Sequence, residues 1–363
     1  MQREAYAAAR PISLKLYDYF TRHREEELRR GQQQLAALPD AETIEAIIDA
    51  AFWASLRREE GYVPKISLAF LSPQQALHPL ILDRPLPLGA DALARVSPAV
   101  ERPGIHLGVW RGEGEICVWG TTHGIPILCF VLEVAAPGLL VVKHHSGDES
   151  RKFVNVAVLE GDLIKIVDEC ASSQPGCPAL LTSLLGFDSP ASWIQSVNTM
   201  VKLAVSMRAH GRGGSLLVVP SNTGQWRESI VQPIPYAVSS PCCDLAPMSD
   251  LTVTAVAGLT AVDGAVVLTD RYELLGFGAK IVRRQGWPQV EQVTLTEPIE
   301  GARPVLMHTE QLGGTRHFSA AQFIHDQRDA VALVASQDGR FTVFEWSTRE
   351  QMVHAHRLDA LLL

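Results

Sequence analysis

The chain has 363 residues, of which 47% are hydrophobic and 20% are charged, and its formal net charge is −8. This length predicts two domains, and the hydrophobic content excludes a globally disordered chain. The acidic balance argues against non-specific binding of DNA or RNA, which needs a basic surface, so we expect neither as a partner.

The sequence offers no membrane-spanning segment and no zinc-binding pattern. Apolar stretches such as 125–136 are shorter than the roughly 18 residues that a spanning helix needs, and Glu133 interrupts this one. The N-terminus lacks the apolar core of a secretory signal. None of the six cysteines stands in a CxxC pair. We therefore expect a cytoplasmic protein without a membrane span.

The first part of the chain is predicted to be helical. Residues 14–38 are rich in strong helix formers. A second helix is predicted over 41–60, because Ile44, Ile47 and Ile48 recur at helical spacing. Asp40 is a suitable N-cap for it, and Gly61 is well placed to end it.

Short apolar runs separated by turn residues follow, and they predict strands of an α+β domain. The predicted strands are 66–71, 105–110, 115–119, 125–133, 138–143, 153–159 and 163–167. The proline-rich segment 79–87 is predicted to be a loop, and 186–190 is predicted to be the domain boundary.

The second half alternates helices with apolar strands, which predicts an α/β domain. The predicted helices are 192–209, 249–258 and 320–327, and the predicted strands are 215–219, 265–269, 273–281, 331–335 and 340–346. The predicted organisation is a helical segment at 1–38, an α+β domain at 39–188, an α/β domain at 190–350 and a tail at 351–363.

Two short motifs in the second half carry residues suited to chemistry. Asp263-Gly264-Ala265 precedes an apolar strand; small residues let a backbone approach a ligand, and the acid could hold a metal. Taken alone, an Asp-Gly pair is most often a simple turn. Gly313-Gly314-Thr315-Arg316-His317 precedes a predicted helix, as a phosphate-binding turn would, with the helix expected to begin near Ser319. The alternative is a surface loop.

The order of these motifs resembles the diadenylate cyclase domain family of the DisA type. The family's glycine turn and apolar strand are similar to 213–220, and its DGA motif is matched at 263–265. Its GTRHR motif is approached by Gly314-Thr315-Arg316-His317-Phe318, and its late serine–glutamate segment by 335–339. The resemblance covers roughly residues 192–350. It implies a mixed sheet flanked by helices.

The resemblance also implies an activity. In that family two domains face each other, each binds one ATP with a divalent metal, and each 3′-hydroxyl attacks the α-phosphate of the other ATP. The chain would then act as a homodimer or higher homo-oligomer that condenses two ATP into cyclic di-AMP and pyrophosphate. Its cofactor would be Mg²⁺ or Mn²⁺.

The resemblance assigns roles to individual residues. It implies catalytic roles for Asp263, Arg316 and His317. It implies that Asp263 and Asp338 hold the metal. The residues implied to bind the nucleotide lie in all of these segments: Gly264, Ala265, Gly314, Thr315 and Ser336.

Two departures from the family pattern support an alternative function. Phe318 stands where the family has a second arginine, which removes a permanent charge from a polyphosphate site. Ser336-Gln337-Asp338 has one carboxylate fewer than the family segment. The alternative is a catalytically degenerate domain that binds a nucleotide or cyclic dinucleotide as a signalling sensor.

The N-terminal half is similar to the soluble sensor domains that accompany such cyclases, including the DACNV type, and would receive a small-molecule or protein signal. Several of its features remain open. His144-His145 could bind a metal or lie in a surface turn, and Trp110 and Trp119 could line a pocket or pack in the core. In the second half, the pair Cys242-Cys243 could be redox-active or consist of buried loop thiols.

Overall fold

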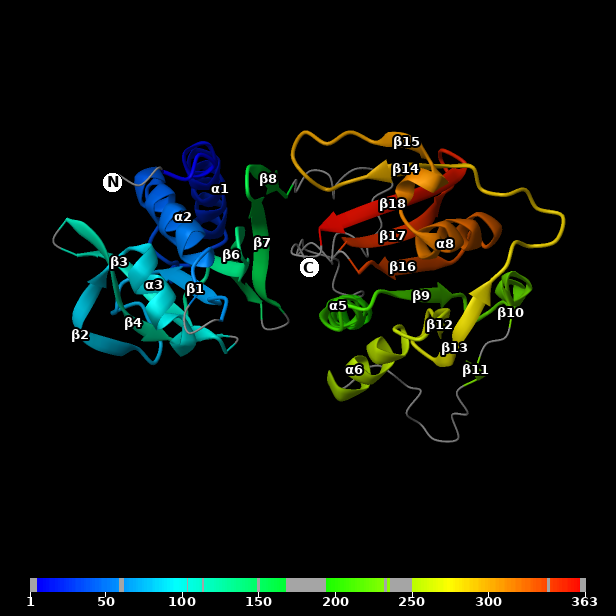
Figure 1. Ribbon diagram of the computed structural model, residues 1–363, viewed down its shortest axis with the longest axis horizontal. Helices are drawn as coiled ribbons and strands as arrows, with labels where there is room; N and C mark the ends of the chain where they lie inside the picture. Colours follow the sequence, from blue (N-terminus) through cyan, green and yellow to red (C-terminus); the bar gives the residue numbers. More distant parts are fainter. Residues whose placement is uncertain are drawn as a thin grey trace. The chain divides into compact units, whose positions relative to one another are not determined.

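A computed structural model describes residues 5–58, 62–102, 104–112, 114–148, 151–167, 194–231, 234–235, 250–337 and 340–359. The chain divides into two compact units, Met1–Val167 and Asp168–Leu363. Each unit has its own mixed β-sheet and its own helices (Figure 1). This agrees with the predicted mixture of helices and strands in both halves.

Unit 1 contains a sheet of eight strands within the described residues, in the order β2-β4-β3-β1-β5-β6-β7-β8. β1 and β3 run parallel, and the other neighbours run antiparallel. The strands are β1 Ile66–Phe70, β2 Leu80–Pro87, β3 His106–Gly112, β4 Glu115–Thr122, β5 Phe130–Ala136, β6 Leu139–Asp148, β7 Arg151–Glu160 and β8 Leu163–Ile166.

The helices of unit 1 are α1 Ala9–Arg29, α2 Ala41–Ser55, α3 Ala90–Val96 and the short 3₁₀ helix η1 Ser97–Val100. As predicted, Asp40 caps α2: its carboxylate accepts a hydrogen bond from the Thr43 N–H at 2.7 Å. The separate helical segment predicted at 1–38 is wrong, because α1 buries Leu16 and Phe20 in the same core as α2 and the strands. α1 also ends at Arg29 rather than near 38.

The loop predicted at 79–87 is also wrong, since these residues form β2. The strand pairs with β4 at Leu80↔Thr121 and Leu86↔Val118, with an irregularity between them. β2 lies at the edge of the sheet, where a proline without an N–H is tolerated. The prolines therefore mark an edge strand here, which the sequence pattern alone does not distinguish from a loop.

Unit 2 contains a larger sheet, whose described strands follow the order β10-β13-β12-β9-β16-β17-β18-β14-β15, with β11 also pairing with β13. β9 runs parallel to β12, and β14 runs parallel to β18. The strands are β9 Gly214–Val219, β10 Ile230–Val231, β11 Ile234–Pro235, β12 Ala265–Thr269, β13 Leu274–Ile281, β14 Gln292–Thr296, β15 Val305–His308, β16 Val331–Ala335, β17 Arg340–Ser347 and β18 Met352–Asp359.

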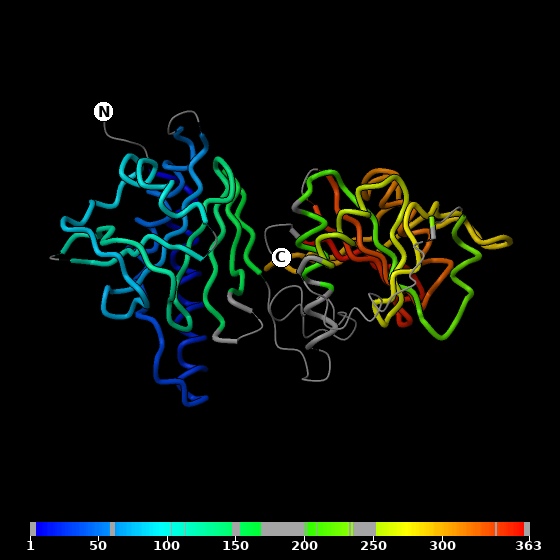
Figure 2. The backbone as a smooth tube through the Cα atoms, turned by 90° about the horizontal axis from the view of Figure 1, so that it is seen from below, coloured from blue at the N-terminus to red at the C-terminus, as the bar shows by residue number. Residues whose placement is uncertain are grey.

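The helices of unit 2 are α5 Ile194–Ala209, η3 Gln225–Ser229, α6 Asp250–Leu259, α7 Thr309–Leu312 and α8 Thr315–Asp326. α8 packs on the sheet through Phe323 and Ile324, which share a buried cluster with Leu217 of β9 and Val334 of β16. Figure 2 follows both units by colour, and neither sheet takes a strand from the other unit.

Two predicted boundaries in the second half differ from the structure, and a third cannot be compared with it. The tail predicted at 351–363 is wrong over β18, which pairs with both β17 and β14 inside the sheet. The helix expected to begin near 319 begins at Thr315, so its first turn contains the predicted phosphate-binding residues. The boundary predicted at 186–190 lies outside the described residues.

Candidate functional site

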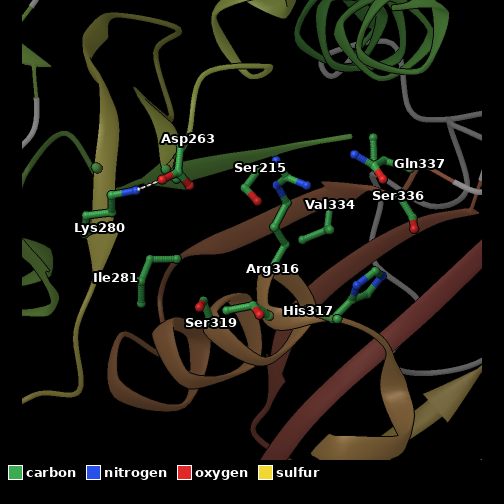
Figure 3. Close-up of a pocket in the computed structure, with 16 residues that line it drawn as sticks. Ser215, Asp263, Lys280, Ile281, Arg316, His317, Ser319, Val334, Ser336 and Gln337 are labelled. Carbon is green, nitrogen blue, oxygen red and sulfur yellow. Dashed lines mark hydrogen bonds and ion pairs between the residues drawn. The ribbon is translucent and has the colours of Figure 1, made fainter. Parts of the chain in front are cut away.

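A cavity of about 670 Å³ lies at one end of the unit 2 sheet, where β9 and β12 begin and β13 and β16 end (Figure 3). The first turn of α8 forms another wall. The cavity brings together residues from five separate elements or their flanking turns. Its lining residues are Ser215, Asp263, Gly264, Ala265, Ala279, Lys280, Ile281, Gly314, Thr315, Arg316, His317, Ser319, Val334, Ala335, Ser336 and Gln337.

Asp263 lies directly before β12, and its side chain is 93% exposed. It forms an ion pair with the ammonium of Lys280 on β13 (Figure 3). The hydrogen bond and charge of Lys280 lower the pKa of the Asp263 carboxyl, with smaller contributions from Arg316 and the Gly264 N–H. The carboxylate is therefore ionised and already lies beside a cation.

Gly264 has a structural reason to be glycine. Its φ is +115°, which side-chain-bearing residues rarely adopt. A Cβ at this position would lie 2.5 Å from the backbone carbon of Gly278 on β13. The close approach of β12 and β13 thus requires this glycine, independently of any nucleotide.

The N-terminus of α8 faces the cavity. Gly314 is its N-cap and supplies no side-chain hydrogen bond, and the first turn contains no acidic residue. The first turn of the helix therefore places no carboxylate of its own beside its first N–H groups at the cavity, and the helix dipole adds partial positive charge. Thr315 is exposed at this turn, and Arg316 extends from it between Asp263 and Ser336 (Figure 3). This arrangement is suited to binding an anion.

His317 and Phe318 differ from their neighbours in the motif. His317 lines the cavity but is largely buried, with its ring edge-on to Phe344 at a centroid distance of 6.1 Å. Phe318 does not line the cavity and instead packs against the core beneath α8. The residue that replaces an arginine of the family pattern therefore contributes to packing here.

The turn after β16 contains Ser336 and Asp338, the last two predicted site residues, and Gln337, which was not predicted. Ser336 lines the cavity, and its backbone N–H donates a 2.8 Å hydrogen bond to the Arg340 carbonyl. Gln337 also lines the cavity, and its amide donates to the Arg212 carbonyl at 3.3 Å. Asp338, the predicted second metal ligand, lies outside the described residues.

Four polar residues of the cavity were not predicted as site residues from the sequence: Ser215, Lys280, Ser319 and Gln337. Ser215 faces the site because β9 pairs with β16 at Ser215↔Val334. Lys280 reaches Asp263 because Ala265 pairs with Ala279 in the β12–β13 hairpin. Strand register determines both positions, and no local motif encodes it.

The described residues contain no cluster of three or more His, Cys, Asp or Glu that could hold a metal. Asp263 is the one carboxylate among the described residues that line the cavity. Mg²⁺ bound with nucleotides commonly takes one or two protein carboxylates and completes its shell with phosphates and water. The donor set therefore fits a metal that arrives with a polyphosphate, and does not fit an all-protein cage.

The residues of unit 1 whose roles the sequence left undecided contribute to its fold. Trp119 is buried, and its indole N–H donates a 2.8 Å hydrogen bond to the Leu71 carbonyl, while Trp110 packs against Phe70. His144 lies in β6 and is buried, with Nε2 3.3 Å from the Tyr19 hydroxyl, so the surface turn is wrong. Cys242-Cys243 lies outside the described residues.

Comparisons with known proteins locate one domain. The family model described as "Probable sensor domain DACNV" matches residues 33–123, which span α2 through β4. Unit 1 therefore contains a region similar to a sensor domain. The chain matched no curated protein. Among the described helices, none combines the length and apolar character needed to cross a membrane.

One solved structure is similar to part of this chain. The crystal structure of a hypothetical membrane spanning protein from Bacillus cereus is similar at 13% identity, over 45% of this chain and 72% of that chain, with a TM-score of 0.27. Likeness at this level carries no argument about the present chain.

Proposed function

We propose that unit 2 is a diadenylate cyclase-like nucleotidyltransferase that condenses two ATP into cyclic di-AMP and pyrophosphate, and that unit 1 regulates it as a sensor. The observation that carries this proposal is the convergence of Asp263 and the Thr315–His317 turn on one cavity, although they are far apart in the sequence. The match of residues 33–123 to a sensor domain supports the regulatory part. The signal would be a small molecule or a protein, and the reaction would take place in the cytoplasm.

The residues of the cavity have complementary tasks in this reaction. The N–H groups at the start of α8, together with Thr315 and Arg316, would bind the phosphates and stabilise the negative charge that develops during transfer. His317 would add a donor from the wall of the cavity. A bound Mg²⁺ or Mn²⁺, held by Asp263 and the phosphates, would supply Lewis-acid polarisation of the reacting phosphate.

The transfer requires two copies of the chain. The 3′-hydroxyl bound in one copy would attack the α-phosphate bound in the other, and pyrophosphate would leave. Asp263 would orient the attacking hydroxyl, while Arg316 would hold the leaving phosphates. A face-to-face homodimer or higher homo-oligomer is therefore part of the proposal.

Incubation of the purified chain with ATP and either Mg²⁺ or Mn²⁺, followed by chromatography, tests the activity. We expect two pyrophosphates for each cyclic di-AMP, because each of the two attacks releases one, and a rate per mole of chain that rises with protein concentration. No product with either metal at high protein concentration would overturn the cyclase proposal.

A second candidate function is nucleotide or cyclic-dinucleotide sensing without turnover. It is favoured by Phe318, which is partly buried and packs against the core where the family pattern has an arginine, and by the ion pair that occupies Asp263. Calorimetry with ATP and with cyclic di-AMP tests it. Binding that Arg316→Ala weakens, without pyrophosphate release, would favour sensing, and the absence of binding would reject it.

A further inference from the structure

We propose that Lys280 is a phosphate-selecting residue of this cavity: it neutralises Asp263 in the ligand-free protein and moves onto the phosphates of a bound polyphosphate, which frees Asp263 for a divalent cation. The inference rests on the proposed function, because it assumes that the cavity receives a polyphosphate. It assigns to Lys280 a control over when Asp263 can bind metal.

The backbone of the β12–β13 hairpin fixes the position of the Asp263–Lys280 ion pair at the open end of the hairpin. The backbones of Gly264 and Gly278 approach so closely that there is no room between them for a Cβ on Gly264. Ala265 pairs with Ala279 one residue further along. This crossing brings the side chains of Asp263 and Lys280 together, 17 residues apart in the chain. The ion pair is thus a consequence of the same hairpin that forms the wall of the cavity.

The exposure of the two groups makes the pair exchangeable. The side chain of Asp263 is 93% exposed and that of Lys280 is 45% exposed. Ion pairs between solvated groups contribute little stability, because water screens them and both side chains lose freedom. A lysine ammonium on its flexible four-carbon chain can therefore leave the carboxylate for a more highly charged ligand.

The charges of the cavity favour that exchange. Among its described lining residues, Asp263 is the one acid, and Lys280 and Arg316 are the permanent bases. With Asp263 paired to Lys280, Arg316 and the N-terminus of α8 remain to attract an anion. A polyphosphate brings several negative charges, so it can engage both bases, and Asp263 is then left without its counterion beside the phosphates.

Lys280 also supplies the cavity with a positive charge in place of the family pattern's second arginine, where this chain has Phe318. Phe318 is partly buried against the core and adds no charge to the cavity. The ammonium of Lys280 lies in the same cavity on a different strand. Because a divalent cation and Lys280 compete for one carboxylate, metal binding at Asp263 should depend on the arrival of the polyphosphate.

The chain offers matched variants. Residues 168–363 contain two lysines, Lys280 and Lys202. Lys202 lies on α5, is exposed and does not line the cavity. Lys280→Met removes the charge, Lys280→Arg keeps it, and Lys202→Met removes the same charge elsewhere in the unit. Lys280→Gln serves as a second neutral variant, so that the test does not depend on the folding of the Met variant.

The first measurement is calorimetry of the full chain with inorganic tripolyphosphate in the presence of EDTA. We expect Lys280→Met and Lys280→Gln to weaken binding about tenfold, as the loss of one charge-assisted contact would. Lys280→Arg and Lys202→Met should stay within about threefold of the wild type. Wild-type affinity in both neutral variants, or no tripolyphosphate binding by the wild type, would overturn the proposal.

The second measurement is a titration with Mn²⁺ alone, followed by electron paramagnetic resonance. Removal of the competing ammonium should let Lys280→Met bind Mn²⁺ about fivefold more tightly than the wild type, and the added substitution Asp263→Asn should abolish that gain. An unchanged Mn²⁺ affinity in Lys280→Met would overturn the proposal. Neither probe contains a nucleoside, so a failure to form cyclic di-AMP would count against the cyclase alone.

Discussion

A buried polar pair in unit 1 contrasts with the charged residues around the candidate site of unit 2. In unit 1, His106 is only 3% exposed, and its Nδ1 lies 2.7 Å from the Ser67 hydroxyl on the neighbouring parallel strand. In unit 2, Asp263, Lys280 and Arg316 surround an open cavity. A buried polar group that already has its partner stabilises a fold, whereas exposed charges around a cavity remain available to a ligand. The convergence of Asp263, Lys280 and Arg316 on one cavity distinguishes the candidate site from this buried pair.

Asp263→Asn should have the largest effect of these substitutions, on cyclic di-AMP formation. A small effect would remove the contrast between the cavity of unit 2 and the buried pair of unit 1. We expect cyclic di-AMP formation to fall about 100-fold or more, because the substitution removes the carboxylate that would hold the metal and orient the hydroxyl. The exposed side chain predicts unchanged unfolding. Chromatography of product and a thermal melt measure the two effects.

The control for this substitution is Asp329→Asn, which removes an exposed carboxylate that does not line the cavity. Its turnover should equal that of the wild type. Equal losses in both variants would mean that Asp263 has no special role.

Gly264→Ala should instead damage the fold of unit 2. The positive φ and the 2.5 Å approach to Gly278 leave no room for the added methyl group, so we expect a loss of about 2–4 kcal/mol in the free energy of unfolding. Urea unfolding measures it. Gly258→Ala in α6 is the matched control, because nothing lies within 4 Å of its added Cβ. Equal stability of the two variants would contradict the close strand crossing.

Unit 1 should lose stability in mild acid because of His106. Burial, followed by the nearby charges of Lys143, His123 and His145, lowers the pKa of His106 from 6.5 to about 4. Between these values the unfolded chain binds a proton that the folded chain does not bind. Stability should therefore be complete above pH 6.5 and fall by about 3 kcal/mol as the pH approaches 4.

Urea unfolding of the wild type and of His106→Gln at pH 7 and at pH 5 isolates this effect, because other titrating groups are common to both proteins. The variant should lose less stability than the wild type between the two pH values. The same loss in both would mean that His106 titrates normally.

Asp40→Ala should have the smallest effect. It removes the acceptor that caps α2, and we expect a loss of about 1 kcal/mol in the free energy of unfolding. Asp40→Ser, which keeps an acceptor, should recover most of it. Both are measured by urea unfolding, and a neutral Asp40→Ala would show that the cap contributes nothing in this context.

Local signals predicted much of the fold. Helical spacing and the Asp40 cap located α2, and apolar runs located most strands. The edge strand β2 was missed because its prolines are typical of a loop. β18 was missed although its partner β17 directly precedes it, because its apolar residues alternate with histidines and form no apolar run. In the site, the motifs located Asp263 and the Thr315–His317 turn. Lys280 could not be predicted, because strand register alone brings it to Asp263.

The position of β18 has a consequence for how the protein is made. Among the described strands of unit 2, β14 and β15 join the sheet only through β18, which follows the others along the chain. During synthesis, the β14–β15 hairpin must therefore wait for the last strand, with its edge exposed to wrong pairing in the meantime. Unit 1 has no such delay, because its strands are complete before unit 2 emerges from the ribosome. Nascent-chain proteolysis should find the hairpin protected only after residue 359 has emerged.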